Sequence, residues 1–201
     1  MPAAELLPTP TPDRVEQECR QFDSEPWNIS GEEALRLLRE HFPENKQVSH
    51  VLLKVLVLNK LYSTRVNDVD VLPLAEHIVR LDLDPQLDQG VLAAVGRIYT
   101  CDNLRMYYSF ATKFCSWHNP KAYPIYDRYA DECLWAYKKQ DGFAKFQHQN
   151  VGYYEEFVAI VSAFRTHYGL DRFTFREIDK FLWRSGERIL RAKEGCISGT
   201  G

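Results

Sequence analysis

The chain has 201 residues, 45% hydrophobic and 26% charged, which is enough for one buried core that could divide into two lobes. No stretch approaches the roughly 18 unbroken apolar residues of a membrane span, and the N-terminus has no basic region before an apolar one. We therefore expect a cytoplasmic protein without a membrane partner. Five widely spaced cysteines without a zinc pattern predict reduced thiols and no bound metal.

The net charge of −3 argues against a nucleic-acid binder, but its distribution is uneven. Residues 1–100 carry 10 Lys and Arg against 16 Asp and Glu, a net −6, whereas residues 101–201 carry 15 against 12, a net +3. Such asymmetry is typical of a one-sided anion-binding face, although an ordinary scatter of solvated charges produces it equally well.

Hydrophobic residues recur at helical spacing, and no useful length of chain alternates with period two. We predict an all-α, compact multi-helix fold. Four prolines within residues 1–12 predict a disordered arm, residues 13–194 a single helical domain, and residues 195–201 a frayed tail. The expected helices cover residues 13–23, 30–42, 47–62, 70–81, 85–100, 105–117, 124–139, 153–168 and 174–191.

Two of these helices are predicted to begin with a capping box, in which a hydroxyl and a Glu three residues later each bind the other's backbone N–H. The pairs are Ser30 with Glu33, and Thr174 with Glu177. The helix over 47–62 is apolar around most of its circumference, so we expect it to be the central buried helix.

The first candidate for chemistry is a lysine and a carboxylate on either side of a proline-containing hairpin. Lys113 lies on the helix before the hairpin, near Phe110, Phe114 and Trp117, and Asp127 lies in the first turn of the helix after it. A lysine attacks as a neutral amine and needs a partly apolar site, and a carboxylate could orient it or stabilise positive charge on a sugar. A surface lysine and an acid that complements the helix dipole are the alternative interpretation.

The second candidate is a concentration of aromatic rings around this hairpin, on which an extruded base could stack. Core packing explains most of these rings equally well, and a histidine at a helix end is often a cap. The residues predicted to contact a substrate are Trp117, His118, Tyr123 and Tyr126.

The third candidate is a ladder of basic residues, four apart, along the last helix, which could follow a phosphate backbone. The solvated face of an amphipathic helix has the same pattern. With basic residues near the hairpin, the predicted contacts to the DNA backbone are Arg105, Lys121, Arg128, Arg176, Lys180 and Arg184.

A helix over 91–100 is followed by a turn over 101–104, a helix bearing Lys113, and then Tyr123-Pro124 before Asp127. This order resembles that of the helix-hairpin-helix DNA glycosylase superfamily. The resemblance is to its oxoguanine and adenine-mismatch branches and covers about forty residues. It implies a glycosylase-like fold with a cleft, DNA as partner, Lys113 as Schiff-base nucleophile and Asp127 as its assistant. The stretch 103–108 lacks the glycines usual in such hairpins, and no four-cysteine loop follows, so we expect no cofactor.

The predicted function is therefore excision of a damaged or modified base from DNA through a lysine Schiff base. The alternative is a non-enzymatic helical module that binds nucleic acid or a protein partner through its basic half.

Overall fold

The computed structural model describes residues 7–101 and 105–198, the last five of these by backbone alone. The described residues form helices joined by loops, with no strand among them, so the predicted all-α class is confirmed. The chain divides into two compact units, a central unit of Asp23–Ile125 and a terminal unit of Met1–Phe22 with Tyr126–Gly201. The predicted single domain over 13–194 stays a prediction. No helix in the described ranges is long and apolar enough to cross a membrane.

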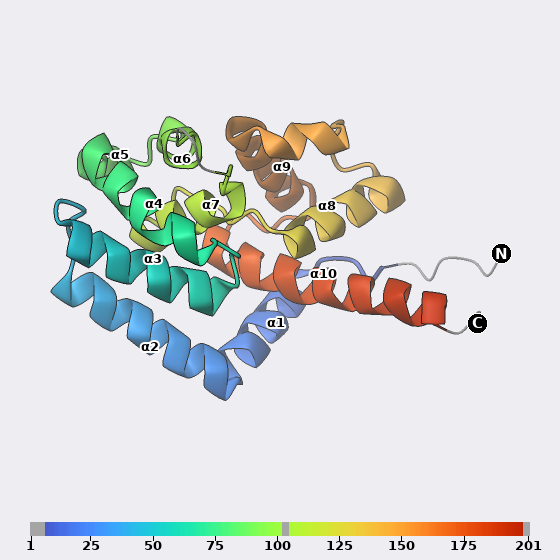
Figure 1. Ribbon diagram of the computed structural model, residues 1–201. Coiled ribbons are helices and arrows are strands. Elements are labelled where there is room, and N and C mark those ends of the chain that lie inside the picture. The colour runs from blue at the N-terminus through green and yellow to red at the C-terminus, as the bar shows by residue number, and fades with distance from the viewer. Residues whose placement is uncertain (1–6, 102–104, 199–201) are drawn as a thin grey trace. The chain divides into compact units, whose positions relative to one another are not determined.

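The central unit is built around a helix that is buried along one face only, so the predicted burial of most of its circumference is wrong: Leu53 and Leu56 are 40% and 49% exposed. α3 (Val48–Tyr62) packs against α2 (Pro26–His41), α4 (Asp68–Leu81) and α7 (Tyr108–His118), and Figure 1 shows it between α2 and α4. Val51, Val55 and Leu58 of α3 have no exposed surface. Their spacing places them on one face of the helix, which is the core of this unit.

The segment predicted as one helix over 85–100 is two short helices, α5 (Asp84–Gln89) and α6 (Ala93–Tyr99). Gly90 separates them in the left-handed conformation, with φ of 72°, and its amide bonds back to the end of α5. A Cβ at this position would also lie 2.6 Å from the Cβ of Ala122. A left-handed cap ends an α-helix, so a glycine within an apolar pattern marks a boundary here.

The terminal unit joins the N-terminal helix to the C-terminal part of the chain. α1 (Pro12–Ser24) contributes its residues up to Phe22, and α8 (Arg128–Asp141), η1 (His148–Gly152), α9 (Tyr154–His167) and α10 (Phe175–Ser198) follow Tyr126. The long α10, red in Figure 1, runs against α8. Buried aromatic rings of Tyr137, Phe164 and Phe181 fill the space between its helices.

Of the two predicted capping boxes, one is confirmed and one is wrong. Glu177 accepts from both the backbone N–H and the hydroxyl of Thr174, at 2.7 and 2.8 Å, and the Glu177 N–H donates back to that hydroxyl at 3.3 Å. Ser30 lies inside α2, which begins a turn earlier at Pro26. Proline is favoured at the first helical position because its missing N–H would have no partner there.

Candidate functional site

Lys113 lies in the middle of α7 and is almost completely buried. Lys113 is 5% exposed, and both Phe110 and Phe114 beside it have no exposed surface. Nζ donates to Oγ of Ser109 at 3.0 Å and lies 5.9 Å from the ring centroid of Tyr62, the last residue of α3. The amine is thus held inside the central unit, beside a hydroxyl and an aromatic face.

Asp127 is the N-cap of α8. Its Oδ1 accepts from the backbone N–H of Ala130 at 2.9 Å, and the helix begins at Arg128 rather than at Pro124 as predicted. A carboxylate in this position binds an N–H that has no partner within the helix. Lys113 belongs to the central unit and Asp127 to the terminal unit, so their pairing stays a prediction.

Trp117 and Tyr123, two of the predicted substrate contacts, are core residues of the central unit. Trp117 is 4% exposed, and its indole N–H donates to the carbonyl of Leu35 at 3.2 Å. Tyr123 has no exposed surface, and its hydroxyl donates to the carbonyls of Gln86 and Val91 at 3.2 and 3.0 Å. Burial raises the pKa of this hydroxyl. These contacts fit the core-packing interpretation of the aromatic cluster.

Tyr126, the third predicted aromatic contact, lies in the terminal unit against a carboxylate that the sequence analysis missed. Its hydroxyl is 3.4 Å from Oδ2 of Asp131, and its ring meets Phe157 edge to face. Burial and the Asp131 charge raise the pKa of Tyr126 to about 12, and burial also raises the pKa of Asp131. Nδ1 of His148 lies 3.4 Å from the second Asp131 oxygen. Asp131 lies four residues after Asp127, and this i, i+4 spacing, which places the two carboxylates on one helix face, was the sequence signal for it.

His118, the fourth predicted contact, ends α7 within a polar cluster that sequence reasoning also missed. Its Nε2 lies 3.1 Å from the amide nitrogen of Asn45, and Asn45 in turn contacts Asp84 and the fully buried Lys54. Burial, with the charges of Lys54 and Arg39, lowers the pKa of His118 to about 3. A lysine within the most apolar helix of the chain was the available signal for this cluster.

The residues predicted to contact the DNA backbone differ in exposure and in their contacts within the protein. Arg105, Lys121 and Arg128 are exposed. On α10, Arg176 pairs with Asp179 at 2.6 Å, and both Arg176 and Lys180 lie over the ring of Phe22.

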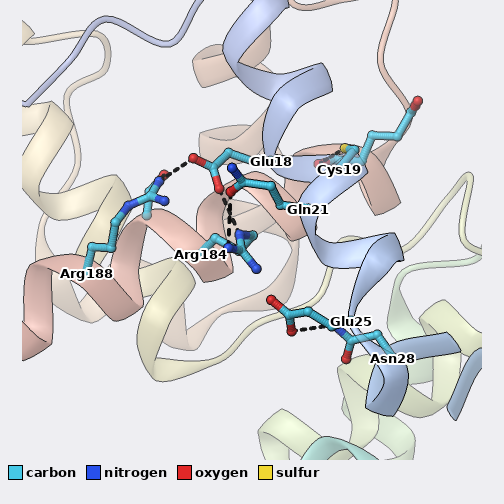
Figure 2. A network of polar contacts seen from close by, with 9 residues as sticks. Glu18, Cys19, Gln21, Glu25, Asn28, Arg184 and Arg188 are labelled. Carbon is cyan, nitrogen blue, oxygen red and sulfur yellow. Dashed lines mark hydrogen bonds and ion pairs between the residues drawn. The ribbon is translucent and has the colours of Figure 1, made fainter. Parts of the chain in front are cut away.

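Arg184 of the same ladder lies in the network of Figure 2, where its Nε donates to Glu18 at 2.8 Å and its Nη2 to Gln21 at 3.2 Å. Arg188 donates to the other Glu18 oxygen at 2.6 Å. The buried side of the ladder therefore joins α10 to α1, and its contact with phosphate stays a prediction.

Metal ligands do not gather in the described residues, where no group of three or more His, Cys, Asp or Glu side chains could hold an ion. The described side chains that could take part in chemistry are two buried amines, of Lys54 and Lys113, together with buried hydroxyls and carboxylates.

The family of this chain is shown by two comparisons. The family model described as HI_0787_N, N-terminal domain, matches residues 14–122, a range that nearly coincides with the central unit and includes Lys113 but not Asp127. An uncharacterized protein of Haemophilus influenzae is 34% identical over 146 residues, which cover 71% of this chain and 69% of that protein. No solved structure matches the chain. The chain therefore belongs to the HI_0787_N family.

Proposed function

We propose that this protein is a DNA base-excision enzyme of glycosylase type, in which Lys113 forms an imine with the sugar of a damaged or modified nucleotide. The observation that carries the proposal is the burial of Lys113 on the inner side of α7, among aromatic rings and beside the hydroxyl of Ser109. Lysines are rarely buried, and an amine used as a nucleophile is one of the reasons for which a protein keeps one inside.

The proposed reaction begins when the neutral Lys113 amine attacks C1′ of the sugar. The new bond between nitrogen and C1′ replaces the glycosidic bond, and the base leaves with a proton. Opening of the sugar ring at O4′ then gives the imine, with the second amine proton lost to O4′. Because Lys113 is only 5% exposed, the nucleotide reaches its amine after local movement of the side chains that cover it.

Asp127 is proposed to assist this reaction as a base or as an electrostatic partner of the developing positive charge. Its carboxylate also caps α8, so a substitution must keep the cap in order to test the charge. Asp127→Asn does so, because an Asn side-chain oxygen accepts the same backbone N–H. We expect loss of activity in this variant with an unchanged helix content.

Borohydride trapping tests the role of Lys113. The full chain is incubated with DNA that carries one abasic site or one 8-oxoguanine, and sodium borohydride reduces any imine to a stable adduct. We expect an adduct with the wild type and with Lys60→Gln, an exposed lysine of α3, and none with Lys113→Gln. Since Lys113 is buried, circular dichroism must show that Lys113→Gln is folded. Peptide mapping of the wild-type adduct identifies the attached lysine independently, and an adduct elsewhere contradicts the proposal.

A non-enzymatic helical module is the second candidate, and one observation favours it. Trp117 and Tyr123 bond to backbone carbonyls in the core, as aromatic residues of a structural module do. DNA binding without an adduct would support this module. Absence of any salt-dependent affinity for DNA would instead support a scaffold that binds proteins.

A further inference from the structure

The central unit contains a polar cluster of Asn45, Lys54, Asp84 and His118, which come from four different elements. Asn45 lies in the loop between α2 and α3 and is 2% exposed. Its Nδ2 donates to Oδ1 of Asp84 at 2.5 Å, and its backbone N–H donates to Oδ2 at 2.9 Å. Nζ of Lys54 donates to Oδ1 of Asn45 at 2.8 Å and to the carbonyl of Glu44 at 2.9 Å.

The two charged neighbours determine which way the Asn45 amide faces. An ammonium can only donate hydrogen bonds and an ionised carboxylate can only accept them. Oδ1 of Asn45 must therefore face Lys54, and Nδ2 must face Asp84. A flipped amide would place its NH₂ against the Lys54 ammonium and its carbonyl against the Asp84 carboxylate.

The orientation of Asn45 in turn determines the protonation of His118. The nitrogen 3.1 Å from Nε2 of His118 is the donating Nδ2 of Asn45, so Nε2 must accept and the ring proton must lie on Nδ1. A proton on Nε2 would direct an N–H at an NH₂ group and would break this contact. The neighbouring charges also keep the His118 ring neutral, because Lys54 of α3 and Arg39 of α2 are cations that disfavour a second positive charge beside them. The Asp84 carboxylate, at the start of α5, is engaged by Asn45.

We propose that this cluster is an acid-sensitive lock, in which protonation of His118 on Nε2 releases Asn45 and frees the 42–47 loop from the end of α7. The lock does not depend on the proposed catalysis. It holds at neutral pH, when His118 accepts from Asn45, and it opens on acidification because the open form binds a proton that the closed form excludes.

Hydrogen exchange of the Asn45 backbone N–H tests the lock, because the Asn45 side chain binds both His118 and Asp84 through Nδ2, and in the open form, where Asn45 has left both, its backbone N–H has also lost the Asp84 acceptor. With an ordinary His118 pKa near 6.5 when open and a pKa of about 3 when closed, opening at pH 5 is about 25-fold more frequent than at pH 7. The protection factor of the Asn45 amide, corrected for intrinsic exchange, should fall by that factor. Amides of α4, which contributes no side chain to the cluster, serve as the reference.

Two variants separate His118 from other titrating groups. His118→Gln supplies an acceptor that does not titrate in this range, so its Asn45 protection should change little between pH 7 and 5. His41→Gln, at an exposed histidine of α2, should keep the wild-type response. Equal acid responses in the wild type and in His118→Gln would overturn the proposal.

Nitrogen NMR of the wild-type protein keeps the proposal testable if His118→Gln does not fold. At pH 7 the His118 ring should show the tautomer with the proton on Nδ1, and its titration midpoint should lie below pH 5. The opposite tautomer, or a midpoint near 6.5, would exclude the lock.

Discussion

Lys54 shows how much one buried residue can change the interpretation of a helix. In the sequence it merely interrupts an apolar run, and in the structure it has no exposed surface and bonds to Asn45 and to the carbonyl of Glu44. Burial lowers its pKa to about 8, against the opposing charges of Asp84 and Glu44. A buried charge without such partners would be strongly unfavourable, so the lysine and its acceptors form one structural unit.

The pH dependence of stability tests the burial of Lys54. Between pH 8 and about 10.5 the unfolded chain keeps the Lys54 proton and the folded chain releases it, so the free energy of unfolding rises with pH. The gain from this residue between pH 8 and 9.5 is about 1.5 kcal/mol. Urea unfolding of the wild type and of Lys54→Met across this range measures it, because the buried tyrosines titrate alike in both. Parallel pH curves would show that Lys54 keeps an ordinary pKa.

The boundaries of the helices follow local chemistry where the signal is unambiguous. Thr174 and Glu177 form the predicted capping box, but a proline at the first position begins α2 before the Ser30 signal. The N-cap of α8 is Asp127 itself, three residues after the predicted start at Pro124. A proline and a capping side chain are alternative signals for a helix start. The proline Pro26 begins α2, and the capping side chain of Asp127 precedes α8.

The packing of α10 against α8 depends on a glycine. A Cβ added at Gly186 would lie 2.0 Å from the carbonyl oxygen of Tyr129, which belongs to the backbone of α8. Gly186→Ala should therefore lower the free energy of unfolding by about 3 kcal/mol, because the helices must separate. Gly96→Ala in α6 is the matched control, since nothing lies within 4 Å of its added Cβ, and it should stabilise by roughly 0.5–1 kcal/mol. Chemical denaturation compares the two, and similar losses would contradict this account.

At the scale of the whole molecule, the terminal unit is discontinuous in sequence, and Glu18 links its two parts. Glu18 is 7% exposed, and its carboxylate binds Arg184 and Arg188 of α10. Burial opposes ionisation of Glu18, but its hydrogen bonds to Arg188 and Arg184 outweigh burial and lower its pKa. The folded state therefore gains stability from this carboxylate above its ordinary pKa of about 4.5 and loses it as the pH falls further.

Glu18→Gln tests this connection between α1 and α10. The amide keeps the size of the side chain but removes its charge, so the free energy of unfolding should fall by about 1–3 kcal/mol at pH 7. Glu16→Gln is the control, because Glu16 forms exposed ion pairs with Arg20 and Arg172, and its effect should stay within about 0.5 kcal/mol. Thermal unfolding at pH 7 and pH 4 compares both with the wild type. A smaller loss for Glu18→Gln than for Glu16→Gln would contradict the linking role.

The sequence by itself determined the helical class and the approximate position of most helices, because periodicity and capping act within a few residues of each other. It left the burial of Lys113 open, since the aromatic residues within one turn of it on α7 fit both a partly apolar site and a surface lysine beside the core. The resemblance to glycosylases stays a prediction, as does the pairing of Lys113 with Asp127.

Only the tertiary structure decided which charges are used inside the protein. Arg184 bonds to a residue 166 positions earlier, and His118 to one 73 positions earlier. The helical periodicity around Arg184 or His118 is the same whether the side chain faces water or a buried partner. The partner is distant in the sequence, and only folding brings it close. The assignment of Trp117 and Tyr123 to the core was decided in the same way, by carbonyl groups of α2 and of the α5 to α6 region.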